Sequence, residues 1–111
     1  MTLLGMQTVL ARLYTDRVFR EAFFADPTTM CARSECTARE RHQLAALDRL
    51  QVERYARSLQ RKRLQSVRVL LPATVNTLSA QFVPLFYEYC DTQPSALEHV
   101  DEAIAFTRFL S

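Results

Sequence analysis

The sequence predicts an all-α fold, a compact single-domain bundle of five or six short helices over residues 1–111. The chain has one glycine and four prolines. A β-sandwich or barrel needs a turn about every ten residues, so this is too little turn chemistry for either. Hydrophobic residues make up 49% and charged residues 23%, the balance of a globular protein. Apolar residues also recur at helical spacing along the chain.

The first 36 residues predict helix followed by a short connection. Residues 1–25 have helical spacing, with a joint at Thr15 and Asp16, because both residues cap helix starts well. The dipeptide Asp26-Pro27 ends the helix, since the residue before a proline is pushed out of the α region. Residues 28–36 are polar and lack periodicity, so we expect a loop or a single helical turn.

A capping box opens the next helix. Thr37 and Glu40 have the spacing at which a hydroxyl and a carboxylate each satisfy a backbone N–H, so a helix begins near Ala38. Its apolar residues are out of phase with the stripe that starts at Val52. Asp48, followed by Gln51, supplies a second capping signal at that phase change. We therefore expect a break at Asp48.

The stretch from Asp48 to Pro72 predicts a two-sided central helix. One arc of about 120° carries its apolar side, the width of a core-facing stripe. The residues on that arc are Val52, Tyr55, Ala56, Leu59, Ser66, Val67 and Leu70. The opposite side carries Arg54, Arg57, Arg61 and Arg68, and Arg63 falls in the middle of the apolar arc.

Proline and capping signals divide the rest of the chain. Pro72 stops or kinks the central helix, and Pro84 is best tolerated in the first turn of another helix. Residues 91–94 predict a turn, and residues 95–98 form a third capping box. The helix that it opens has its apolar side at Ala96, Val100, Ala103, Ile104, Thr107 and Leu110.

The arginine stripe is the best indication of function. Like charges at these spacings repel by a few tenths of a kcal/mol per pair, so we expect something to offset them. The first hypothesis is a non-enzymatic accessory module that binds a partner protein or peptide through this face, with Leu50 and Leu64 adding apolar contact. The alternative is a solvated surface. A nucleic-acid-binding module is a weaker hypothesis, because aromatic interleaving and a helix-turn-helix glycine are missing.

Arg63 needs a partner, because an unpaired buried charge costs several kcal/mol. We expect it to pair with Glu88 or Asp91 in the acidic third of the chain. A structural ion pair is favoured over a ligand anchor, since buried charges are normally paired.

The sequence indicates no enzyme and no cofactor. His42 and His99 lack a neighbouring nucleophile held by a third group. Cys31, Cys36 and His42 suggest zinc, but a structural site wants four ligands and the fourth is missing, so we expect no metal. Cys90 lies in an apolar run, where a buried and inert thiol is expected.

An aromatic cluster lies in the run before that thiol. Phe82, Phe86, Tyr87 and Tyr89 predict core, because aromatics at this density usually fill the space between short helices. The alternative is a small-ligand carrier that uses the cluster as its pocket.

The sequence predicts a cytoplasmic protein without a membrane segment. No apolar run reaches the roughly 18 residues of a membrane helix, and Arg12 and Asp16 interrupt the N-terminal apolar stretch. Three cysteines without framework spacing favour free thiols.

Three phrases together carry a family resemblance: LARLYTDRVFREAFFADP, ARSLQRKRLQSVRVLLPAT, and FVPLFYEYC with DEAIAFTRFL. They resemble small uncharacterised helical bacterial domains that are similar to partner proteins of multinuclear-iron enzymes, such as the small subunit in methanobactin biosynthesis. The resemblance implies an accessory or interaction module acting beside a peptide-modifying enzyme. It carries no catalytic motif, and the chain shows no added peptide-recognition domain.

Overall fold

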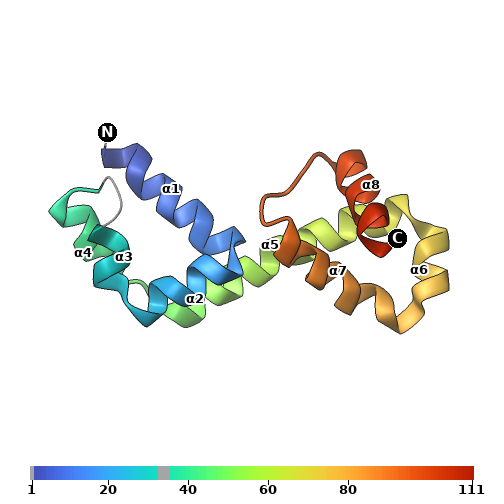
Figure 1. Cartoon of the computed structure of the whole chain (residues 1–111), viewed down its shortest axis with the longest axis horizontal. Helices are drawn as coiled ribbons and strands as arrows, with labels where there is room; N and C mark the ends of the chain where they lie inside the picture. The colour runs from blue at the N-terminus through green and yellow to red at the C-terminus, as the bar shows by residue number, and fades with distance from the viewer. Residues whose placement is uncertain (1, 33–35) are drawn as a thin grey trace. The chain divides into compact units, whose positions relative to one another are not determined.

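Helices make up the regular structure of the chain. The computed structural model describes residues 2–32 and 36–111, and the side chains of residues 5–30 and 36–111. These ranges contain no strand, so the all-α prediction is confirmed, with more helices than the five or six expected. The elements are α1 (Thr2–Thr15), α2 (Arg17–Ala25), α3 (Pro27–Ala32), α4 (Ala38–Ala45), α5 (Arg49–Leu70), α6 (Pro72–Leu78), a 3-10 turn η1 (Ser79–Gln81), α7 (Phe82–Thr92) and α8 (His99–Leu110) (Figure 1).

The chain divides into two compact units, Met1–Arg57 and Ser58–Ser111. Helix α5 begins in the first unit and ends in the second. The single domain over residues 1–111 stays a prediction, because a compact unit can be a domain by itself or part of a larger one.

Local capping sets the helix boundaries of the first unit. The Asp16 carboxylate accepts a hydrogen bond from the Phe19 amide at 3.1 Å, which starts α2 at the expected joint. Asp26 ends α2, and the Thr37–Glu40 capping box is formed, so both predictions are confirmed. Of the two structures expected for residues 28–36, a loop or a single helical turn, the structure has a short helix over residues 28–32, as part of the six-residue α3, while residues 33–35 lie outside the described part.

The core of the first unit is mostly aliphatic. Its buried members are Val9, Leu13, Phe23, Leu44 and Val52. Asp48 accepts a hydrogen bond from the Leu50 amide at 3.1 Å, and α5 starts at Arg49, so the predicted break is confirmed.

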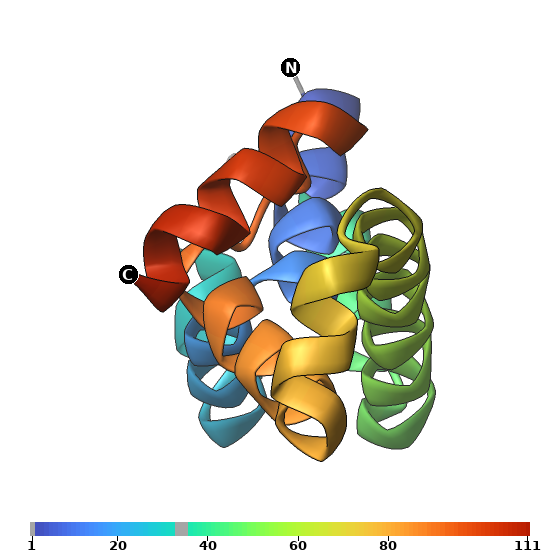
Figure 2. The same ribbon diagram turned by 90° about the vertical axis from the view of Figure 1, so that its right-hand side faces the viewer.

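The second unit has an aromatic core. Pro72 stands at the start of α6 and separates it from α5, as its missing N–H predicts. Helix α7 carries Pro84 in its first turn and lies against α6 and α8 (Figure 2). The buried residues are Leu64, Val67, Phe82, Phe86, Tyr89, Cys90, Ala103 and Phe106.

Three predictions about the end of α7 and about α8 were wrong. The helix begins at His99 with Glu98 as its N-cap, so residues 95–98 form no capping box, and α7 extends to Thr92 instead of turning at residue 91. The buried side holds Glu102, Ala103 and Phe106, about a quarter turn from the expected side. Val100 and Ile104, which we expected to be buried, are 52% and 46% exposed. The buried side of α8 differs from the expected one because the Glu102 carboxylate faces the interior, where it accepts hydrogen bonds from Arg63 and Tyr89.

No single helix among the described residues is long and apolar enough to cross a membrane. Helix α5 and the helices of residues 72–92 reach that length and composition only as a pair bent at Leu71.

Candidate functional site

A buried ion pair joins α5 to α8 in the second unit. The guanidinium of Arg63 donates from Nε to Oε2 of Glu102 at 3.1 Å and from Nη2 to Oε1 at 2.5 Å. The side chains are only 9% and 3% exposed. Two parallel bonds between a planar guanidinium and a carboxylate are the strong form of this interaction and fix its orientation.

Backbone and side-chain groups complete the network. Nη2 and Nη1 of Arg63 also donate to the carbonyl oxygens of Gln93 and Pro94, at 2.8 and 3.2 Å. Glu102 accepts two further bonds, from the Tyr89 hydroxyl at 2.9 Å and the Leu97 amide at 3.2 Å. The pair therefore ties the connection between α7 and α8 to α5, and we call these contacts the Arg63–Glu102 network.

The network changes the acidity of its members. Burial favours the neutral form of Arg63, but the hydrogen bond to Glu102 and its negative charge outweigh burial and raise the pKa of the guanidinium. Burial, followed by the hydrogen bond to Glu102, raises the pKa of the Tyr89 hydroxyl. Both groups therefore keep their protons at neutral pH, so Arg63 is a cation and Tyr89 is a neutral phenol.

The partner that we expected for Arg63 was wrong. Glu88 is exposed on α7, and the buried carboxylate that binds Arg63 belongs to Glu102, not to Glu88 or Asp91. The Arg63 side chain is only 9% exposed, as its place in the apolar arc predicts. Its bonds are those of a structural ion pair.

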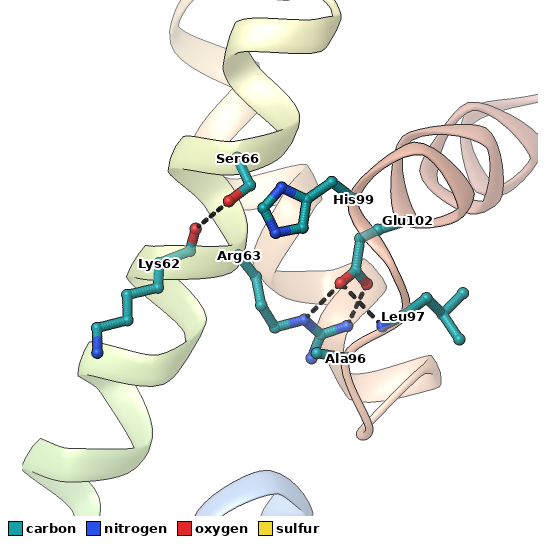
Figure 3. Close-up of a pocket in the computed structure, with 7 residues that line it drawn as sticks. All are labelled: Lys62, Arg63, Ser66, Ala96, Leu97, His99 and Glu102. Carbon is teal, nitrogen blue, oxygen red and sulfur yellow. Dashed lines mark hydrogen bonds and ion pairs between the residues drawn. The ribbon is translucent and has the colours of Figure 1, made fainter.

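A cavity of about 140 Å³ lies beside the network in the second unit. It is lined by Lys62, Arg63 and Ser66 of α5, by Ala96 and Leu97 of the connection, and by His99 and Glu102 of α8. Figure 3 shows the His99 ring beside Ser66 and close to the ion pair. The Ser66 hydroxyl donates to the Lys62 carbonyl at 3.2 Å. We call this space the α5–α8 cavity.

All four arginines of the predicted stripe are exposed. Arg54 and Arg57 belong to the first unit, and Arg61 and Arg68 to the second. None of the four forms an ion pair with a side chain of residues 5–30 or 36–111, although the Arg68 guanidinium lies 5.8 Å from the centre of the Phe82 ring. Each side chain is therefore available to solvent.

Leu64, which we expected to add apolar contact to the stripe, is only 6% exposed and packs in the core of the second unit. Its expected role in partner binding was wrong. It lies about 60° around α5 from Val67. The buried side of this part of the helix is therefore wider than the predicted apolar arc. Leu50 is exposed, as its place on the basic side requires.

The cysteines and histidines do not come together among the described residues. Cys36 is half-buried, His42 is exposed, and the side chain of Cys31 lies outside the described part. No group of three His, Cys, Asp or Glu side chains that could hold a metal occurs where side chains are described.

The aromatic cluster forms core. Phe82, Phe86 and Tyr89 are buried and contact Phe106 ring to ring, with centroids 5.1 to 5.6 Å apart. Tyr87 is only half-buried. Cys90 is buried beside them, and burial raises the pKa of its thiol to about 11. The thiol is therefore neutral and inert at ordinary pH.

Of the residues that line the cavity, only Arg63 was predicted as a site residue; the charged or titratable ones that were not predicted are Glu102, His99 and Lys62. A signal was present for Glu102, which stands four residues before Phe106 and eight before Leu110, in one row of a helix. A carboxylate in an apolar row is the counterpart of Arg63 in its apolar arc. For His99 and Lys62 the sequence carried no signal, because a cavity depends on how helices pack.

Comparison with known proteins identifies the family. The model described as "SCO6045-like, C-terminal domain" matches residues 45–111, more than half of the chain. The chain therefore belongs to this family, and the matched part includes all of α5 to α8. No curated protein and no solved structure matches the chain. The family description names neither an iron enzyme nor a peptide, so a link to methanobactin biosynthesis stays a prediction.

Proposed function

We propose that this member of the SCO6045-like C-terminal domain family is a non-enzymatic accessory module that binds an acidic segment of a partner protein. The contacts are made by the exposed arginines of α5. The single observation that carries the proposal is the state of Arg54, Arg57, Arg61 and Arg68: exposed, repeated along one helix, and without an ion pair in the described part of the chain.

Electrostatics favours this reading over a solvated surface. No acid among residues 58–111 of the second unit forms an ion pair with Arg61 or Arg68, and the buried carboxylate of Glu102 pairs with Arg63 instead. Repulsion between like charges on α5 is relieved when a partner brings carboxylates to them. Arginine also suits this task, since its fork matches a carboxylate with two parallel bonds.

The test uses a fluorescein-labelled peptide rich in Glu and Leu, with a counterpart in which each Glu is Gln. We expect anisotropy to show binding of the Glu peptide to the full chain, weakening as salt screens the charges. Arg61→Gln with Arg68→Gln should weaken binding about three- to tenfold, as should Arg54→Gln with Arg57→Gln. The pairs are tested separately because they belong to different units.

The matched control is Arg39→Gln with Arg41→Gln, two exposed arginines of α4 outside the stripe. This variant has the same net charge as either test variant and should bind within twofold of the original chain. Equal losses in all three variants would show that only net charge matters. Equal binding of the Glu and Gln peptides would remove the proposal.

Nucleic acid is the second candidate for the same arginines. Mixed-sequence duplex DNA in the same assay separates the two, because DNA affinity falls with salt at a slope set by the number of phosphates contacted. Tighter binding of DNA than of the Glu peptide, with a steep slope lost in the Arg61 and Arg68 variant, would favour it.

The nature of the partner is a further part of the proposal. The resemblance to partner proteins of multinuclear-iron enzymes supports a peptide-modifying enzyme as the partner. A complex of the chain with such an enzyme, disrupted by the stripe variants and not by the α4 control, is the result expected.

A further inference from the structure

The α5–α8 cavity differs from the exposed stripe because it is a built space. Its floor is the Arg63–Glu102 network, in which both ions are buried and hydrogen-bonded. Glu102 already accepts four hydrogen bonds, from Arg63, Tyr89 and Leu97. Its carboxylate therefore has no lone pair left for a visiting cation, and the two opposite charges of the floor cancel.

The size of the cavity selects its occupant. About 140 Å³ is close to the roughly 150 Å³ that holds a benzene-sized molecule. Pockets for drug-sized ligands and cofactors are about 300 to 1,000 Å³. One side chain or one chain end fits the cavity, and a cofactor does not.

The walls add a polar and an apolar side. The His99 imidazole has no hydrogen-bond or ion-pair partner among the side chains of residues 5–30 and 36–111, so it is free to donate to a ligand. Ala96 and Leu97 offer apolar surface to methylene groups. The Lys62 ammonium extends away from the cavity in Figure 3, and its flexible four-carbon stem can bring it to the mouth.

Two acids stand near α8 and do not occupy this space. The Glu98 carboxylate accepts from the Val100 amide at 3.2 Å. Asp101 lies about 160° around α8 from His99 by helical geometry. Among the residues that line the cavity, Lys62 is the charged group that remains outside the Arg63–Glu102 pair.

We propose that the α5–α8 cavity is an anchor site for a carboxylate group, supplied by one residue of the acidic partner. The carboxylate accepts from the His99 imidazole and faces Lys62, while its methylene groups lie on Ala96 and Leu97. This inference rests on the proposed function for the identity of the partner. It adds a second point of contact, at which one acidic residue of the partner is held in a fixed position.

The experiment is an NMR titration of the ¹⁵N-labelled full chain with three small probes. N-acetyl-glutamate N-methylamide carries a side-chain carboxylate, N-acetylalanine carries a chain-end carboxylate, and N-acetyl-glutamine N-methylamide is neutral. We expect saturable shifts at residues 62–66 and 96–102, with dissociation constants on the order of millimolar, as a contact of one residue allows. The neutral probe should bind at least about fivefold more weakly.

The two carboxylate probes distinguish the sources. Binding of only the glutamate probe assigns an internal acidic side chain, and binding of only N-acetylalanine assigns a chain end. Binding of both identifies a general carboxylate site. Equal shifts from the neutral amide, or shifts along the arginines of α5 with none at residues 96–102, would overturn the proposal.

Two variants test the walls. Ala96→Leu fills the cavity without changing charge and should abolish the shifts, whereas Ala73→Leu makes the same change at an exposed position of α6. Lys62→Gln should weaken the glutamate probe about fivefold, whereas Arg108→Gln, an equal loss of charge on α8, should leave it within twofold. Circular dichroism checks that each variant is folded. If Ala96→Leu unfolds, the effect of Lys62→Gln on binding of the glutamate probe tests the proposal instead.

The Glu and Leu peptide separates this inference from the function on which it rests. If Ala96→Leu leaves peptide binding unchanged while Arg61→Gln with Arg68→Gln weakens it, the cavity proposal fails and the proposed function stands. If neither change affects the peptide but the small carboxylates still bind, the cavity is a carboxylate site and the arginine stripe is only solvated. Loss in both variants supports both.

Discussion

The ion pairs of the two compact units differ in their burial and in the distance along the chain between their partners. Three ion pairs of the first unit join residues four apart on the chain: Arg12 with Asp16, Arg17 with Glu21, and Arg49 with Glu53. The pair of the second unit joins residues 39 apart and is buried. A pair of the first kind reinforces a helix that would form anyway, whereas the second kind fixes how two helices and their connection are placed.

The cores differ in the same direction. Mostly aliphatic side chains fill the first unit, and four aromatic rings in mutual contact fill the second, beside the ion pair. Aliphatic cores tolerate rearrangement as long as volume is kept. The bidentate Arg63–Glu102 pair and the Tyr89 hydroxyl do not tolerate such rearrangement, because each of their hydrogen bonds requires a fixed orientation of donor and acceptor. The second unit is therefore the more sensitive to single polar changes.

The largest effect is expected from Glu102→Gln, which leaves the Arg63 guanidinium buried without its counter-ion. We expect a loss of about 3 to 5 kcal/mol in the free energy of unfolding, measured by urea denaturation of the full chain. Amide hydrogen exchange at Phe86 should accelerate more than at Leu13, since the damage lies in the second unit. Equal acceleration at both residues would show that the units open together.

Replacing both ions tests whether the Arg63–Glu102 pair stabilises the folded state or only fixes the orientation of the two helices. Arg63→Met combined with Glu102→Leu leaves no uncompensated charge, so the double variant should be at least about 2 kcal/mol more stable than the sum of the single losses predicts. The carbonyl oxygens of Gln93 and Pro94 lose their donor in that variant. Additive losses would show that the contacts to the connection, not the mutual attraction of the ions, dominate.

The second effect is a pH dependence that belongs to the second unit. The pKa of Cys90 is raised from 9.0 to about 11, chiefly by burial. Below pH 9 the thiol is protonated in both states and the folded state keeps its full stability. Between pH 9 and 11 the unfolded state loses the proton first, so stability falls, by about 2 to 3 kcal/mol.

Cys90→Ala should therefore flatten the decline of unfolding free energy between pH 9 and 10, followed by urea denaturation at each pH. Above pH 10 a decline should remain, because the pKa of the Tyr89 hydroxyl is also raised by burial. Cys36→Ala is the matched change in the first unit, where the thiol is only half-buried. It should leave most of the decline in place. An unchanged slope in the Cys90 variant would mean that the thiol is not the group that titrates.

The third effect is a single hydrogen bond. Tyr89→Phe removes the hydroxyl that donates to Glu102 at 2.9 Å and keeps the ring in the core. We expect a loss of about 1 kcal/mol in urea denaturation. Tyr14→Phe removes a hydroxyl that has no hydrogen-bond partner among the described residues, and should change stability by less than about 0.5 kcal/mol. Equal losses would break the comparison of the units.

Sequence reasoning succeeded where a few neighbouring residues decide the outcome. The joint at Asp16, the capping box at Thr37 and the stop before Pro72 depend on contacts within four residues. The apolar arc of α5 also placed Arg63 inside, because helical spacing is local. These predictions needed no knowledge of the partner helix.

It failed where distant residues decide. The start of α8 and its buried side depend on Glu102, whose bonds reach back to α5 and α7. Apolar spacing alone favoured Val100 and Ile104, which are exposed. Leu64 was misplaced for a similar reason, since the width of a buried arc is set by the helices that cover it. The α5–α8 cavity exists only in the packed unit.

The smallest effect is expected from Glu53→Gln, which removes the counter-ion of Arg49 in the first unit. The two atoms are 2.9 Å apart, close to the distances inside the Arg63–Glu102 network, so geometry alone would predict similar losses. Solvent decides otherwise, because both side chains are at least one-third exposed and water replaces the lost partner. We expect a loss below about 0.5 kcal/mol, shrinking further in high salt. A loss above about 1.5 kcal/mol that does not shrink in high salt would contradict this expectation. It would show that burial and distance along the chain do not explain the different contributions of the two ion pairs to stability.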